Sequence, residues 1–157
     1  MSPLPFSHPA SLLATWFGAG LLPKAPGTWG SLAALPFGLA IASLAGPWGL
    51  LAAALVVLVL GAWAAGVYAT HSGQDDPQTV VIDEVVGMWL ALVPAALDPW
   101  LYALAFLAFR CFDIVKVWPA GLIDRRLKGG WGIMGDDVAA GVYAGAVVYA
   151  VSFMIGQ

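Results

Sequence analysis

The sequence contains very little charge for its length. Only 6 Lys and Arg and 9 Asp and Glu occur among 157 residues, whereas 61% of the residues are apolar. An average soluble domain is roughly 25% charged, so these residues cannot cover a water-soluble globule of this size. The composition excludes a disordered chain, and the net charge of −3 excludes nucleic acid as a main partner. We expect one all-helical, membrane-embedded domain over residues 1–157.

Cysteine and histidine are also scarce. The single cysteine, Cys111, excludes an intramolecular disulfide, and its neighbours Phe109 and Phe112 predict a buried, inert thiol. The two histidines, His8 and His71, are isolated from each other and from Cys111 in the sequence. A zinc site is therefore not expected.

Proline and glycine divide the chain. No basic cluster precedes an apolar run at the N-terminus, so no signal peptide is expected, and three early prolines are expected to break any early helix. Five apolar blocks follow, and we expect each to form a helix that crosses the bilayer. They span residues 31–45, 48–70, 76–97, 100–117 and 137–155, with Asp76 as the expected N-cap of the third. A re-entrant hairpin formed by the first two blocks is the alternative.

The charged connections between the predicted helices fall on one side of the membrane. With five crossings, the N-terminal segment, residues 71–77 and residues 118–136 share one side, which holds Lys24, Arg125, Arg126 and Lys128. The other side holds Gly46-Pro47, Asp98-Pro99 and the C-terminus, without Lys or Arg. The positive-inside rule makes the first side cytoplasmic.

Seven ionisable residues lie inside or at the edge of the predicted helices, where a charge is costly and indicates function. One face of the fourth predicted helix carries Arg110, Asp113 and Lys116. Asp113 is then expected at a depth in the membrane where it can meet Asp83 and Glu84. The others are Asp136 and Asp137. Simpler explanations are an Arg110–Asp113 ion pair and an N-cap at residues 136–137. Three other aspartates are interpreted as solvated turns and N-caps: Asp75, Asp76 and Asp98.

Five carboxylates in one region need a counter-charge, and Mg²⁺ prefers such oxygen ligands. Two glycine-rich stretches, residues 26–31 and 129–135, precede predicted helices beside the acids, so their backbone N–H groups are expected to cradle a phosphate, with a flexible connector as the alternative. From its residues alone, the chain is predicted to be a small helical membrane protein with a Mg²⁺ site for a phosphorylated substrate.

Four sequence blocks carry a family resemblance. They are APGTWGS at residues 25–31, DEVVGMW at 83–89, FRCFDIVK at 109–116, and GGWGIMGDD at 129–137 followed by Ala140-Gly141. In this order they closely resemble the phosphatidylglycerophosphatase A family over about residues 12–150. One departure is Val117, where the family usually has a proline after the equivalent of Lys116; Pro119 remains.

The resemblance implies a Mg²⁺-dependent phosphatase of the bacterial cytoplasmic membrane. It would hydrolyse phosphatidylglycerophosphate to phosphatidylglycerol at the cytoplasmic face. The expected catalytic and metal-binding residues are Asp83, Glu84, Asp113, Asp136 and Asp137. The expected phosphate-binding residues are Lys24, Gly27, Thr28, Ser31, Arg110 and Lys116. A metal-activated water is the expected nucleophile, with an aspartyl-phosphate intermediate as the alternative.

Other functions stay open at this point. Another membrane phospholipid phosphatase, or a phosphotransferase that joins a CDP-activated lipid to an alcohol, would share the acids, but the sequence lacks the motifs of these classes. An ion-coupled transporter would use the buried acids, but no internal repeat is present. Gly61 with Ala65, and Gly141 with Gly145, predict close helix packing within one chain or between the subunits of a homo-oligomer.

Overall fold

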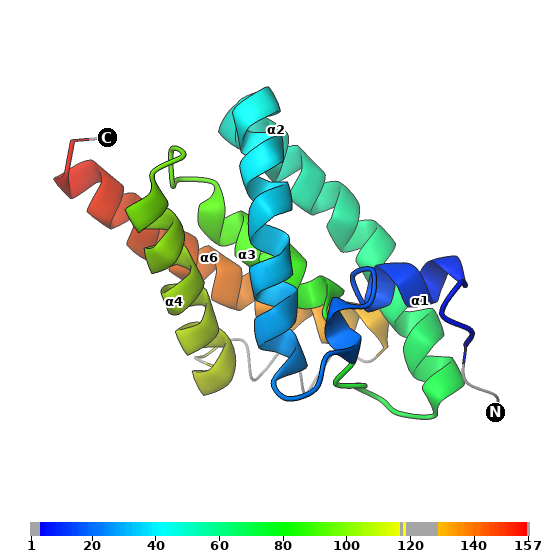
Figure 1. The fold of residues 1–157 in the computed structure, drawn as a ribbon. Coiled ribbons are helices and arrows are strands. Elements are labelled where there is room, and N and C mark those ends of the chain that lie inside the picture. The colour runs from blue at the N-terminus through cyan, green and yellow to red at the C-terminus, as the bar shows by residue number, and fades with distance from the viewer. Residues whose placement is uncertain (1–3, 117, 119–128, 157) are drawn as a thin grey trace.

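The computed structural model describes residues 4–116, 118 and 129–156, and every regular element in this part of the chain is helical (Figure 1). The elements are α1 (Pro9–Ala14), a 3-10 turn η1 (Ala19–Leu21), α2 (Pro26–Ser72), α3 (Ile82–Leu92), α4 (Pro99–Val115) and α6 (Gly130–Met154). The predicted all-helical class is therefore confirmed for the described residues. By length and composition, α2 and α6 are able to cross a membrane.

Helix α2 consists of two legs that meet at Gly46. Gly46 has φ 69° and ψ −173°, a conformation that glycine adopts without steric penalty, and Pro47 begins the second leg. Residues 26–45 and 47–72 therefore form a helical hairpin (Figure 1). The predicted break at Gly46 is confirmed, although the first leg starts at Pro26 rather than at Ser31.

The helical segments run back and forth between two ends of the molecule. The acidic end carries the start of α2, residues 76–84, the end of α4 and the start of α6. The apolar end carries residues 46–47, 92–97 and 149–152. Within the described part of the chain, the connections predicted to lie on opposite sides of a membrane lie at opposite ends of the molecule, and the membrane crossings themselves stay a prediction. Residues 119–128, with Arg125, Arg126 and Lys128, lie outside that part.

Helix α3 starts later than the sequence predicts, so the expected N-cap at Asp76 is wrong. The Val81 N–H donates a hydrogen bond of 2.8 Å to the carbonyl of Ala14 in α1. Because of this tertiary contact, helical geometry begins only at residue 82. Asp83 and Glu84 consequently lie in the first turn of α3 rather than two turns inside it. Carboxylates are favoured there because a helix N-terminus carries partial positive charge.

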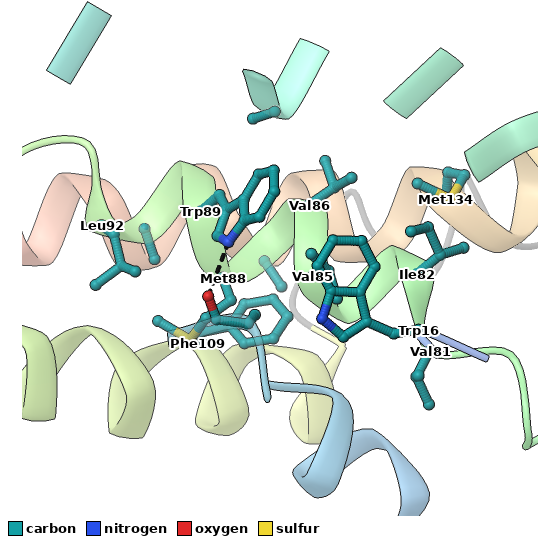
Figure 2. Close-up of a cluster of buried hydrophobic side chains, with 14 of the residues drawn as sticks. Trp16, Val81, Ile82, Val85, Val86, Met88, Trp89, Leu92, Phe109 and Met134 are labelled. Carbon is teal, nitrogen blue, oxygen red and sulfur yellow. Dashed lines mark hydrogen bonds between the residues drawn. The ribbon is translucent and has the colours of Figure 1, made fainter. Parts of the chain in front are cut away.

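Helix α3 is central to the hydrophobic core. Most of its side chains are buried, and they meet Phe109 from α4, Met134 from α6 and Trp16 from the segment after α1 (Figure 2). The indole of Trp89 also donates a hydrogen bond of 2.9 Å to the carbonyl of Ala34 in the first leg of α2. Every described long helix thus packs against α3. This packing fixes the position of the first turn of α3, which carries Asp83 and Glu84.

Helices α3 and α6 cross where two glycines meet. A Cβ atom at Gly141 would overlap the carbonyl oxygen of Gly87, and a Cβ at Gly87 would lie 2.6 Å from the carbonyl oxygen of Asp137. Gly61 in turn lies against Met134. The close packing predicted for Gly61 and Gly141 therefore occurs within one chain, and it brings Asp137 next to α3.

Helix α6 starts earlier than the sequence predicts, and α1 is a helix that the sequence does not predict. Helix α6 begins at Gly130 rather than at Asp137, so residues 130–135 are helical and the predicted N-cap at residues 136–137 is wrong. Gly130 packs directly on the carbonyl of Ala62, where a Cβ would overlap. Helix α1 forms although early prolines were expected to prevent it, because Pro9 occupies a first-turn position that needs no N–H donor.

Candidate active site

A cavity of about 350 Å³ lies at the acidic end, where the starts of α2 and α3, the end of α4 and the second turn of α6 meet. Its lining residues are Ala25, Pro26, Gly27, Asp76, Gln78, Val80, Asp83, Glu84, Arg110, Asp113, Lys116, Asp136 and Asp137. The structure therefore brings together all five predicted carboxylates and both predicted cations of α4. We call this the acidic cavity.

Asp83, Glu84 and Asp137 form a tight cluster in this cavity. Each offers one carboxylate oxygen, and these atoms lie within 4.8 Å of one another. Asp137 is only 3% exposed. Oδ1 of Asp83 and Oε2 of Glu84 are buried and have no hydrogen-bond partner among the described residues. Clustered carboxylates repel one another, and an unpaired buried oxygen loses its hydration, so this cluster must be neutralised, either by protons or by a bound cation.

A hard divalent cation fits this cluster. Mg²⁺ binds oxygen ligands at about 2.0–2.1 Å, so its ligands lie about 3–4 Å apart in an octahedron, and small side-chain movements bring the three oxygens to that spacing. Among its described lining residues, the cavity offers carboxylate oxygens but no imidazole or thiol. This donor set is typical of Mg²⁺, Ca²⁺ or Mn²⁺ rather than zinc.

Asp113 and Asp136 are engaged by cations instead. Arg110 Nη1 lies 2.5 Å from Asp113 Oδ2, and Lys116 Nζ lies 2.6 Å from Asp136 Oδ2. The ion pair considered for Arg110 and Asp113 is therefore present. Arg110 also keeps a buried Nε without a hydrogen-bond partner among the described residues. The predicted metal-binding roles of Asp113 and Asp136 stay predictions.

The first turn of α2 contributes backbone to the cavity. A Cβ at Gly27 would overlap Oε1 of Glu84 and lie 3.2 Å from Nη1 of Arg110, so any other residue here would displace the Glu84 carboxylate. Residues 26–31 are helical, and the predicted glycine-rich loop is wrong here as it is for residues 130–135. The Ser31 hydroxyl donates a hydrogen bond of 2.8 Å to the Gly27 carbonyl. Three predicted phosphate-binding residues are not among the lining residues: Lys24, Thr28 and Ser31.

Two polar lining residues are absent from the predicted site. Asp76 and Gln78 belong to the connection between α2 and α3, and both are exposed at the cavity. Asp76 was interpreted as a solvated cap because a proline follows it. The predicted order of helices contains the relevant information, because it places this connection on the same side of the membrane as the acids.

Cys111 is exposed, so the predicted burial of its thiol is wrong. It lies on the outward face of α4 together with Leu107 and Ile114, and it does not line the acidic cavity. Aromatic neighbours in the sequence predict burial in a water-soluble protein. They do not do so in a chain whose outer surface is itself apolar.

Comparisons with known proteins point to one family. A family model described as Phosphatidylglycerophosphatase A matches residues 12–152. The chain is 41% identical over 156 residues to Phosphatidylglycerophosphatase A of Escherichia coli (strain K12), covering 96% of this chain and 87% of that protein. It is 40% identical over 148 residues to the Haemophilus influenzae protein of the same name, covering 93% and 90%.

A relative with a different name is equally similar. A Bacteroides thetaiotaomicron protein, provisionally named phosphatidylinositol-3-phosphatase, is 42% identical over 153 residues, covering 92% of this chain and 94% of that protein. No solved structure matches the chain.

Proposed function

Because the chain belongs to the phosphatidylglycerophosphatase A family, we propose that it hydrolyses phosphatidylglycerophosphate to phosphatidylglycerol and inorganic phosphate. The observation that supports this most directly is the acidic cavity, where three clustered carboxylates lie beside Arg110 and Lys116. A phosphate monoester carries up to two negative charges, and its hydrolysis requires that these charges be neutralised and the leaving oxygen be stabilised.

Mg²⁺ is the cofactor that we propose. Asp83, Glu84 and Asp137 would hold one or two ions, with Asp113 and Asp136 contributing directly or through water. When bound, Mg²⁺ supplies positive charge to the phosphate and makes a nearby water molecule more acidic.

The protein's own groups would position the phosphate. Arg110 and Lys116 neutralise the non-bridging oxygens, and the N-termini of α2 and α3 add partial positive charge. Water attacks phosphorus, the bond from phosphorus to the glycerol oxygen breaks, and the leaving alkoxide takes up a proton. Attack by one of the aspartates, with an aspartyl-phosphate intermediate, is the alternative route.

We further propose that the chain crosses the bacterial cytoplasmic membrane several times, with the acidic end on the cytoplasmic side. Exposed tryptophans support two interfaces, since Trp29 and Trp131 lie near the acidic end and Trp48 and Trp100 near the apolar end. All Lys and Arg occur at position 24 or within residues 110–128, as the positive-inside rule requires. A lipid in the inner leaflet would then present its terminal phosphate at the depth of the cavity.

The test is phosphate release from phosphatidylglycerophosphate in mixed detergent micelles. We expect release with Mg²⁺, its loss with excess chelator, and its return when Mg²⁺ is restored. Cys111→Ser, outside the cavity, should retain turnover and serves as the control. A folded protein that releases no phosphate would contradict the proposed activity, whereas release that ignores the chelator would contradict only the role of Mg²⁺.

Phosphatidylinositol 3-phosphate is the competing substrate, because of the name of the Bacteroides thetaiotaomicron relative. Both lipids carry a terminal phosphate monoester, so the acidic cavity suits either one. We expect a higher kcat/KM for phosphatidylglycerophosphate when the two lipids have matched acyl chains. The opposite preference would change the substrate while keeping the phosphatase activity.

A further inference from the structure

Asp76 and Gln78 differ from the other polar residues of the acidic cavity. They are exposed at its mouth, whereas Asp137 is buried in the cluster. Gln78 is also the only neutral hydrogen-bonding side chain among the described lining residues, since the other polar ones are all charged. We call Asp76 and Gln78 the mouth residues.

The backbone that carries the mouth residues is held in place on two sides. The Val81 N–H bonds to the carbonyl of Ala14, and Gly20 packs directly on the carbonyl of Thr79. On the other side, the Thr79 hydroxyl donates a hydrogen bond of 3.2 Å to the Tyr68 hydroxyl in the second leg of α2. The chain is therefore fixed at Thr79 and Val81, directly after Gln78, which restricts where the mouth residues can lie, as a specificity element requires.

The chemistry of the mouth residues suits a hydroxyl group rather than a phosphate. A carboxylate repels a phosphate but accepts a hydrogen bond from an O–H group, and an amide both donates and accepts. The phosphate already has Arg110, Lys116 and the carboxylate cluster with its cation. A neutral hydrogen-bonding part of the substrate, adjacent to the phosphate, is the group left for Asp76 and Gln78.

We propose that Asp76 and Gln78 bind the free hydroxyl of the glycerol that carries the terminal phosphate. This inference rests on the proposed function, and it names the feature by which the substrate is selected. Phosphatidic acid has no free hydroxyl, because its phosphate is attached directly to diacylglycerol. The mouth residues would therefore favour phosphatidylglycerophosphate over phosphatidic acid.

The experiment compares kcat/KM for these two lipids, with the same short acyl chains, in detergent micelles containing Mg²⁺. For Gln78→Ala and Asp76→Ala, we expect the ratio of kcat/KM for phosphatidylglycerophosphate to kcat/KM for phosphatidic acid to fall about 10-fold or more. The fall should come mainly from a higher KM for phosphatidylglycerophosphate. Gln74→Ala is the matched control. Gln74 is an exposed amide of the same connection that lines an adjoining hollow but not the acidic cavity, so its ratio should equal that of the wild type.

Each other outcome contradicts a specific statement. An equal loss on both lipids would assign a general or structural role to the mouth residues and overturn the inference. A wild-type protein that hydrolyses both lipids equally well would overturn it too, while leaving the proposed function intact. A wild-type protein that releases no phosphate from phosphatidylglycerophosphate would overturn the proposed function and the inference together.

Discussion

The two ends of the molecule are built from the same helices but hold opposite kinds of cavity. The acidic cavity, of about 350 Å³, is lined by six carboxylates and two cations. At the apolar end, a cavity of about 470 Å³ is lined mostly by aliphatic side chains, and its polar side chains are Tyr102, Tyr149 and Ser152. Both cavities lie where helix ends meet, so the residues at those ends, rather than the architecture, make one of them suitable for an anionic substrate.

Helix direction adds to the difference. Among the described long helices, α2, α3 and α6 begin at the acidic end, whereas the second leg of α2 and helix α4 begin at the apolar end. The partial positive charge of these three helix starts is partly offset at the acidic end by the C-terminal ends of the second leg of α2 and of α4, so the helix dipoles leave a net positive contribution where a phosphate would bind. The one carboxylate that starts α4, Asp98, instead accepts hydrogen bonds from the Trp100 and Leu101 N–H groups. The interpretation of Asp98 as an N-cap is confirmed.

The largest predicted effect is at Asp137. Asp137→Asn preserves the side-chain shape and removes one charge of the cluster, so phosphate release should fall by roughly 10²–10³-fold. Because repulsion within the cluster also falls, the metal-free variant should unfold at a higher temperature than the wild type, and Mg²⁺ should raise its midpoint less. Phosphate assays and thermal unfolding with and without Mg²⁺ measure both effects.

Asp98→Asn is the matched control at the apolar end. Asparagine caps a helix as well as aspartate does, so this variant should retain turnover and its response to Mg²⁺. If Asp137→Asn retained near-normal turnover, the assignment of the acidic cavity as the active site would be wrong.

The second effect concerns the packing that places Asp137. In Gly141→Ala, the new Cβ would overlap the Gly87 carbonyl, so α3 and α6 must separate, and the free energy of unfolding should fall by about 3 kcal/mol. Gly145→Ala lies one turn farther toward the apolar end, where a Cβ would be 3.1 Å from the Leu90 carbonyl, and it should cost about 1 kcal/mol. Denaturant unfolding measures both, and equal losses would contradict the close crossing at Gly141.

The sequence predicts the helical segments better than their starts. The apolar blocks and the break at Gly46 follow from hydrophobicity and from the backbone freedom of glycine, which are local properties. The starts of α3 and α6 depend instead on partners distant in the chain, the Ala14 carbonyl for Val81 and the Ala62 carbonyl for Gly130. No local propensity contains that information, and the starts were therefore misplaced.

The candidate site, like the helices, is predicted from the sequence only in part. The cost of charge in an apolar chain was enough to single out the five carboxylates that the structure brings into one cavity. The i, i+3 spacing already offered the Arg110–Asp113 ion pair. The sequence did not show that Lys116 pairs with Asp136 while Asp83, Glu84 and Asp137 cluster, because those contacts depend on how α3, α4 and α6 pack.

The third effect is confined to stability at the apolar end. Asp98→Ala removes the acceptor for two N–H groups of the first turn of α4, so it should lower the free energy of unfolding by about 1 kcal/mol. Turnover at the acidic end should not change. Parallel unfolding and phosphate assays test this, and a loss of turnover with intact stability would show that the two ends are coupled.

The smallest predicted effect is at Tyr102 in the apolar cavity. Its hydroxyl is buried without a hydrogen-bond partner among the described residues, so Tyr102→Phe removes an unsatisfied group. The free energy of unfolding should stay the same or rise by up to about 1 kcal/mol, without a change in turnover. Tyr149→Phe, which alters an exposed side chain of the same cavity, should have no effect. A loss of stability in Tyr102→Phe alone would mean that the hydroxyl binds a polar partner in solution, and the apolar end would then be less apolar than its lining residues indicate.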